Sequence, residues 1–230
     1  MGWGLKKRGA GSTGWRALSF KVAGMTRILL ISGSTREASL HTAALRTAAM
    51  VAPGTVTAGL YDGLRGLPAY APGEQHDAVT LLRHVAGTAQ GIVFSTPEIA
   101  GSLPGSLKNL LDWLVEGAEL WDKPVAWVSV ANPGDDHGAL STLETVLGHG
   151  NARVLRSAII RLPMGKEAVG ADGLIADPRL HQAMRDMLHA FERAVAPKPE
   201  ETPSWQVQSS LYPMVPQLQA GAARHRRSGS

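Results

Sequence analysis

The sequence predicts an α/β protein in which a parallel sheet carries helices on both of its faces. Five short apolar runs of strand length alternate with longer stretches of helical period, which is the pattern of a parallel sheet. The composition, with 44% hydrophobic and 18% charged residues, is that of a globular protein. A length of 230 residues fits one domain with extensions.

The first half of the pattern contains two strand–helix units. The apolar run 26–32 ends at Gly33, and an Ala/Leu-rich helix is expected over about 40–51. A second strand at 55–61 is followed by a Gly/Pro-rich loop and a helix near 76–89. The alternation of strand and helix predicts two successive strand–helix units.

The third strand, 91–95, precedes the most regular helix of the chain. Pro104 is well placed in the first turn of this helix. Its apolar residues recur at helical spacing and predict one core-facing stripe, which consists of Leu103, Leu107, Leu110, Leu111 and Leu114.

Two further strands complete the predicted sheet. The fourth, 124–130, is followed by a helix over about 138–147, and a fifth single strand is expected over 154–162. Pro178 opens a closing helix that extends to 195. Five parallel strands of this kind bind ligands at their carboxyl ends, which draws attention to the loops 33–39, 96–103 and 131–138.

The charge of the chain is divided unevenly. The net charge is +4 overall, but residues 1–24 carry +5 and residues 196–230 carry +2, so residues 25–195 carry −3. We therefore expect a folded domain over 25–195 between a basic, flexible N-terminal extension and a Pro-rich, basic, flexible C-terminal tail. Because the net positive charge lies in the two extensions, a nucleic-acid partner is not expected.

Several classes of protein are excluded by residues that the sequence lacks. Without cysteine there is no disulfide, thiolate metal ligand or cysteine nucleophile. The histidines occur without a neighbouring carboxylate set, so no metal site is predicted. No stretch approaches the roughly 18 apolar residues of a membrane span. We expect no membrane partner and, since no export signal is evident, a cytoplasmic location.

The loop SGSTREAS (32–39) has the chemistry of a phosphate site. Gly33 permits close backbone approach, the serine and threonine hydroxyls donate hydrogen bonds, and Arg36 supplies a cation at the start of a helix. The loop matches neither GxxxxGK[ST] nor GxGxxG. From this loop alone, an ordinary connection with a solvated Arg36 remains equally open.

Two segments together resemble one known family. STPEIAGSLPGSLKNLLDWL (95–114) resembles the segment TPEYNGSxPGxLKNxxDWL of the NADPH-dependent FMN reductases, which include flavodoxin-like quinone, azo-dye and chromate reductases. SGSTREASLHTAAL (32–45) resembles the SGSxRxxSxNxxL phosphate loop of the same family. The resemblance covers about residues 25–195, and the loop 131–138 matches least well.

This resemblance implies a flavodoxin-like sheet of strand order 2-1-3-4-5 that binds FMN and uses NAD(P)H as co-substrate. It implies an oxidoreductase whose acceptor is a small molecule such as a quinone, with free flavin, azo compounds or metal oxyanions as further options. The flavin supplies the chemistry, so no catalytic side chain is predicted. The cofactor-binding residues that it implies are Ser34, Arg36, Ser39, Leu40, His41, Pro97, Glu98, Ile99, Ala100 and Gly101.

The resemblance also implies a homodimer or homotetramer that assembles through the segment 97–114. Four residues of this segment are expected to support the site or the interface: Lys108, Asn109, Asp112 and Trp113.

The chain departs from the family pattern at three positions. His41 replaces an asparagine near the phosphate, and Ile99-Ala100 replaces the Tyr-Asn of PEYN. These replacements keep two other functions open: a flavodoxin-like electron carrier, and a scaffold or regulatory protein that has lost flavin binding. Retained flavin would exclude the scaffold, and NAD(P)H turnover would exclude the electron carrier.

Overall fold

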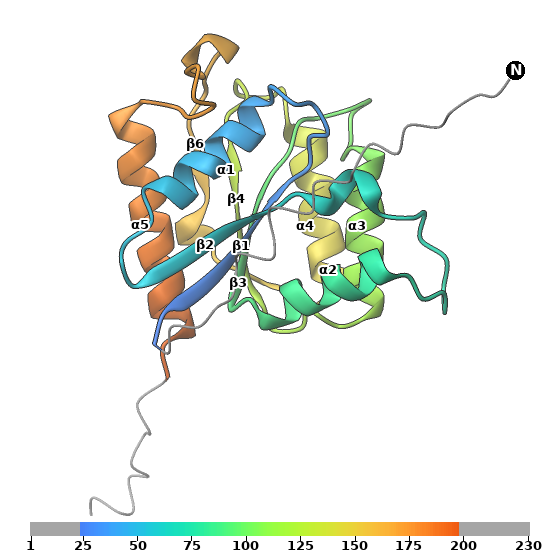
Figure 1. The fold of residues 1–230 in the computed structure, drawn as a ribbon. Helices are drawn as coiled ribbons and strands as arrows, with labels where there is room; N and C mark the ends of the chain where they lie inside the picture. Colours follow the sequence, from blue (N-terminus) through green and yellow to red (C-terminus); the bar gives the residue numbers. More distant parts are fainter. Residues whose placement is uncertain (1–23, 198–230) are drawn as a thin grey trace, which may run out of the picture. The chain divides into compact units, whose positions relative to one another are not determined.

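The computed structural model describes residues 24–197, which form a parallel sheet covered by helices on both faces (Figure 1). The sheet order is β2-β1-β3-β4-β5, and β6 also pairs with β4, which confirms the predicted order of the five strands. The expected extensions, 1–24 and 196–230, lie almost wholly outside the described residues. The strands are β1 (Thr26–Ser32), β2 (Val56–Tyr61), β3 (Gly91–Ser95), β4 (Pro124–Ser129), β5 (Arg153–Val154) and β6 (Ile160–Arg161).

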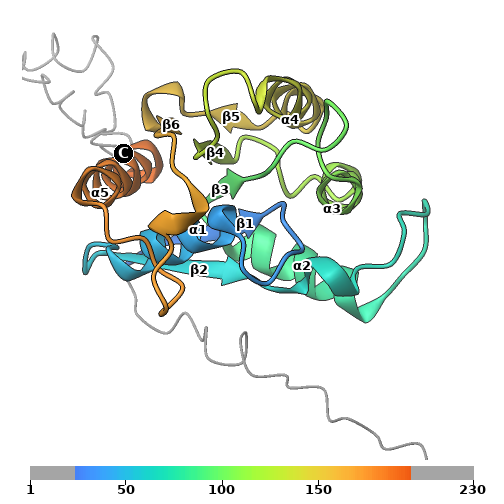
Figure 2. The same ribbon diagram turned by 90° about the horizontal axis from the view of Figure 1, so that it is seen from above.

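Five α-helices join these strands and cover the two faces of the sheet. Helices α1 and α5 pack on one face, and α2, α3 and α4 pack on the other (Figures 1 and 2). Their ends lie within about two residues of the predicted ones, as expected for helix boundaries. The helices are α1 (Leu40–Met50), α2 (Asp77–Thr88), α3 (Gly105–Glu116), α4 (His137–His149) and α5 (Pro178–Val195).

The central strands are buried on both faces, which explains why they are continuously apolar rather than alternating. Leu29 and Ile31 of β1 face the helices α2, α3 and α4, whereas Ile28 and Leu30 face α1 and α5. Successive side chains of a strand point to opposite faces, so one run of residues supplies two cores.

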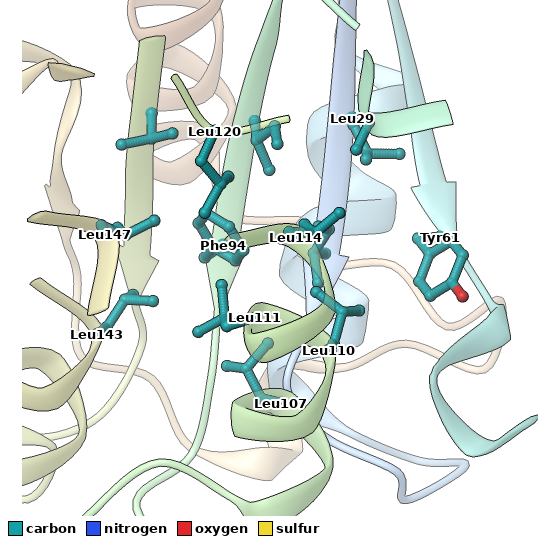
Figure 3. Packing of buried hydrophobic residues seen from close by; sticks show 14 of the residues in the cluster. Leu29, Tyr61, Phe94, Leu107, Leu110, Leu111, Leu114, Leu120, Leu143 and Leu147 are labelled. Carbon is teal, nitrogen blue, oxygen red and sulfur yellow. The ribbon is translucent and has the colours of Figure 1, made fainter. Parts of the chain in front are cut away.

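The predicted leucine stripe of α3 lies in the first of these cores. Figure 3 shows it directed toward β1 and β3, beside leucines of α4. All five predicted stripe residues are buried, and burying one such side chain contributes about 1.5–3 kcal/mol. The stripe therefore fixes α3, and with it the loop that precedes α3, against the sheet.

The prediction of a single fifth strand over 154–162 was wrong. The chain pairs with β4 twice, at Val125↔Val154 and at Val128↔Ile160, so three extra residues stand between the two pairings on the outer strand. These residues form a short 3-10 turn, Arg156–Ala158. An edge strand tolerates such an insertion because only one neighbour must keep its register.

No helix within residues 24–197 is long and apolar enough to cross a membrane.

Candidate functional site

A cavity of about 320 Å³ opens beside the carboxyl ends of β1 and β3. The chain leaves β1 for an outer position, β2, and returns on the other side as β3, so the cavity lies at the switch point of the sheet. Two stretches form most of its lining, and we call them the β1–α1 wall (residues 33–41) and the β3–α3 wall (residues 97–104). Of the ten predicted cofactor residues, all but Ala100 and Gly101 line it.

The β1–α1 wall begins with a glycine that nothing larger can replace without movement. A Cβ on Gly33 would lie 2.3 Å from Thr96 Oγ1 and 2.8 Å from Leu107 Cδ2. The wall ends with Ser39, whose side chain accepts a hydrogen bond from Thr42 N at 3.4 Å and caps α1. The remaining backbone N–H groups of the first turn of α1 favour an anion at this position.

Hydroxyl groups tie the start of this wall to helix α1. Ser32 Oγ and Thr42 Oγ1 lie 2.8 Å apart, and Ser34 N donates to Ser32 Oγ at 3.3 Å. Arg36 N in turn donates to Ser34 Oγ at 3.3 Å. Because the backbone is held by its own side chains, the loop has a defined path before any ligand is present.

Two cations line the cavity, Arg36 and Lys166. Within residues 24–197 neither side chain forms an ion pair, so both charges remain available to an anion. Lys166 was not among the residues predicted from the sequence. It follows the segment that pairs with the end of β4. Its position beyond the carboxyl end of a strand is the signal that could have placed it at the ligand-binding edge of the sheet.

His41 lines the cavity from the first turn of α1, partly buried. Its Nδ1 lies 3.1 Å from Ser95 Oγ, and Ser95 Oγ donates to the carbonyl oxygen of Val128 at 2.7 Å. Burial lowers the pKa of His41 to about 4, and the negative charge of Asp136 opposes this shift only in part. The imidazole is therefore neutral at physiological pH.

The β3–α3 wall contains a closed two-residue turn. Ile99 N donates to Ser102 O at 2.9 Å, and Ser102 N donates to Ile99 O at 3.1 Å. The central residues, Ala100 and Gly101, have φ values of 51° and 74°. Both are left-handed, as in the type of turn that favours Asn-Gly. The turn survives with alanine in place of asparagine because its hydrogen bonds come from the backbone.

Glu98 lines the cavity and is also bonded, through one carboxylate oxygen, to helix α4. Glu98 Oε2 accepts hydrogen bonds from Gly138 N at 2.8 Å and Ala139 N at 3.1 Å, at the N-terminus of α4. A Cβ on Gly138 would lie 2.1 Å from the carbonyl oxygen of Gly101. The β3–α3 wall is thus fixed directly onto α4.

Two of the four expected support residues act within the chain, on the loop after β2. Asn109 Oδ1 accepts from Tyr70 N at 2.7 Å, and Asn109 Nδ2 donates to Pro68 O at 2.8 Å. Trp113 Nε1 donates to the same carbonyl at 3.1 Å. Lys108 and Asp112 form an ion pair at 2.6 Å along the surface of α3.

The loop 131–138 contributes no residue to the lining of the cavity. Its Asp136 is buried and accepts a hydrogen bond from Ser129 Oγ at 2.5 Å, which holds the loop against the end of β4. Across residues 24–197, no group of three or more His, Cys, Asp or Glu side chains is placed to bind a metal.

The chain is similar to flavoenzymes over most of the described domain. Residues 26–166 match the family of NADPH-dependent FMN reductases. A quinone reductase from Escherichia coli is 30% identical over 105 residues, which are 44% of this chain and 54% of that protein. An NAD(P)H-dependent FMN reductase from Pseudomonas aeruginosa is 28% identical over 177 residues, which are 72% of this chain and 93% of that protein.

The match therefore spans only about half the length of the Escherichia coli quinone reductase. Among solved structures, the flavoenzyme NAD(P)H:acceptor oxidoreductase FerB from Paracoccus denitrificans superimposes with a TM-score of 0.64 at 23% identity, covering 74% of this chain and 97% of that one. An oxidoreductase from Corynebacterium diphtheriae superimposes with a TM-score of 0.54 at 13% identity, covering 77% and 100%. These likenesses confirm the fold.

Proposed function

Because this chain belongs to the NADPH-dependent FMN reductase family, we propose that it is an FMN-dependent oxidoreductase, which takes electrons from NADPH or NADH and passes them to a small acceptor. A quinone is the favoured acceptor, since relatives include quinone reductases. An azo compound is a further option, since an NADPH azoreductase is also similar. The observation that carries the proposal is the cationic cavity at the switch point of the sheet.

The residues around the cavity fit the phosphate end of FMN. The β1–α1 wall offers hydroxyl groups of Ser34 and Ser39 and the first-turn N–H groups of α1. Arg36 and Lys166 add two positive charges, and Glu98 is turned toward α4. Charge-assisted hydrogen bonds of this kind are about twice as strong as neutral ones, so the phosphate would provide much of the binding free energy.

The rest of the lining fits a flat apolar group. Leu40, Pro97, Ile99 and Pro104 present apolar surface to the same cavity. When bound there, FMN supplies the hydride- and electron-transfer chemistry. These side chains would pack against the ring and exclude water, and the closed turn at 99–102 would keep the backbone beside the ring in a fixed position.

The proposal is tested by reconstituting the full-length protein with FMN. We expect retained flavin, bleaching of its absorption on addition of NADPH or NADH, and turnover with a quinone. Arg36→Ala and Lys166→Ala are each expected to weaken FMN binding about tenfold, as for loss of a charged hydrogen-bond donor. Arg179→Ala is the control, because Arg179 is bonded to Asp177 at the start of α5.

The outcomes separate the three functions that the sequence left open. Flavin that is retained and reduced only by a strong chemical reductant, without NAD(P)H turnover, would favour the electron carrier. A folded protein that retains no flavin would favour the scaffold. Equal loss of FMN affinity in the Arg179→Ala control would show that the binding reflects net charge and not this cavity.

We further propose that the protein is cytoplasmic and assembles as a homodimer or homotetramer through the segment 97–114. Ile99 supports the interface, because this apolar residue is 50% exposed on the turn next to α3. Ile99→Asp should shift the mass measured by light scattering toward the monomer. Leu81→Asp on α2, where the leucine is 47% exposed, is the matched control and should leave the mass unchanged.

A further inference from the structure

The hydrogen bonds around Ser95 define which nitrogen of His41 carries a proton. Ser95 Oγ has one hydrogen, and it donates this hydrogen to the carbonyl oxygen of Val128 at 2.7 Å. Ser95 Oγ is therefore an acceptor toward its second neighbour, His41 Nδ1, at 3.1 Å. The proton in that contact must come from the histidine, so Nδ1 is protonated.

A neutral imidazole has one ring proton, and placing it on Nδ1 leaves Nε2 with a free lone pair. His41 lines the cavity, and within residues 24–197 its Nε2 has no hydrogen-bond partner. The cavity therefore contains an acceptor at this position. The asparagine that the family has at the same position can either donate or accept, whereas His41 in this state can only accept.

We infer that Nε2 of His41 accepts a hydrogen bond from a hydroxyl of the bound cofactor, and that His41 does not bind the phosphate. This inference rests on the proposed FMN site. A phosphate dianion offers only acceptor oxygens and would face the lone pair of Nε2, whereas the ribityl chain of FMN carries hydroxyl donors. Binding of the phosphate then falls to Arg36, Lys166 and the N-terminus of α1.

Burial keeps the His41 ring neutral, and the negative charge of Asp136 opposes this only in part. The other charged side chains that line the same cavity are Arg36, Lys166 and Glu98. Glu98 is already bonded to α4. Since burial outweighs the attraction of Asp136, we expect FMN binding to involve no proton uptake by His41 between about pH 6 and pH 8.

The tautomer is measured by nuclear magnetic resonance on full-length protein labelled with ¹⁵N-histidine, with His41 assigned by comparison with His41→Asn. We expect a proton on Nδ1 and none on Nε2, both without FMN and with it. A proton on Nε2 in the ligand-free protein, or a doubly protonated ring in the complex, would overturn the inference. If wild-type protein binds no FMN, the proposed function fails, while the ligand-free spectrum still decides the acceptor assignment.

Two variants then test the hydroxyl contact. Both lose the ring bonded to Ser95, but His41→Asn keeps a side-chain acceptor and His41→Leu does not. His41→Leu should weaken FMN binding about fivefold, as for one lost hydrogen bond, and His41→Asn less than about twofold. Urea unfolding checks that both variants are folded.

Sulfate separates the phosphate contact from the hydroxyl contact, because at neutral pH it carries no hydroxyl and can only accept. Its affinity, measured by competition with FMN, should change less than about twofold in His41→Leu. A loss of sulfate affinity equal to the loss of FMN affinity would place His41 at the phosphate and contradict the inference. Equal weakening of FMN binding by His41→Leu and His41→Asn would also contradict it.

Discussion

The two walls of the cavity obtain their shapes in different ways. The β1–α1 wall is shaped by side chains, through the hydroxyl contacts of Ser32 and Ser34 and the cap by Ser39. The β3–α3 wall is shaped by its backbone, through the turn between Ile99 and Ser102. Replacing one of these side chains in the first wall therefore changes the chemistry offered to a ligand, whereas a replacement within the turn of the second wall leaves the turn in place.

The departures from the family pattern follow this difference. Ala100 stands where the family has asparagine, and the turn still closes. His41 also stands where the family has asparagine, but there the exchange converts a group that can donate or accept into one that only accepts. In the β3–α3 wall, loss of the asparagine amide therefore leaves the backbone turn closed. In the β1–α1 wall, it changes the hydrogen bonds that the wall offers to a ligand.

The largest expected effect concerns His41 and pH. An unfolded histidine binds a proton near pH 6.5, and folded His41 only near pH 4. Between these values the unfolded state binds more protons, so the free energy of unfolding falls as the pH falls. Each unit of pKa difference corresponds to about 1.4 kcal/mol, so the free energy of unfolding is about 3 kcal/mol lower at pH 4 than above pH 6.5. Above pH 6.5 nothing is lost, because His41 is neutral in both states.

Urea unfolding of the wild type and His41→Asn at several pH values measures this loss. The wild type should lose stability faster than the variant below about pH 6, and the two curves should run parallel above it. Parallel curves over the whole range would show that His41 is not held neutral by the β1–α1 wall.

Gly33→Ala should have the next largest effect. The added Cβ would meet Thr96 and Leu107, which flank the β3–α3 wall in the sequence, and overpacking of this kind costs about 1–3 kcal/mol. Chemical unfolding gives the value, and Gly105→Ala is the control because nothing lies within 4 Å of its Cβ position. A Gly33→Ala variant as stable as this control would mean that the wall can shift freely.

Glu98→Ala tests how the β3–α3 wall is fixed to α4. It removes an acceptor for two N–H groups at a helix N-terminus, and we expect a loss of about 1 kcal/mol in the free energy of unfolding. Glu98→Gln keeps an oxygen acceptor but not the charge, so it should lose about half as much. A loss in FMN affinity without a loss in stability would instead place the carboxylate in contact with the ligand.

The smallest effect is a gain. Ala100 has a φ of 51°, a conformation that glycine adopts at no steric cost, so Ala100→Gly should raise the free energy of unfolding by about 0.5–1 kcal/mol. Ala118→Gly, at a φ of 60° after α3, should give a similar gain away from the cavity. FMN affinity should be unchanged in both. A change in FMN affinity confined to Ala100→Gly would show that the FMN site depends on the side chain at position 100.

The order of the elements and the edge that carries the site could be predicted from the sequence. Hydrophobic period and turn residues are local signals, and they placed the α3 stripe at Leu107 and Leu111 and the phosphate loop after β1. They failed at the edge strand, where residues 154–162 were predicted as one strand although the polar residues Arg156 and Ser157 fall in the inserted turn Arg156–Ala158. The types of the residues do not show how many of them lie between the two points at which the outer chain segment pairs with β4.

The sequence by itself determined the fold class, the sheet edge and most of the residues around the cavity. The tertiary structure alone decided what several of those residues do there. Glu98 caps a helix that begins about 40 positions later, Lys166 reaches the cavity from beyond β6, and the proton on His41 depends on Ser95, 54 positions away. Hydrogen bonds and charges act over a few ångströms of space, and only folding brings distant parts of the chain within that range.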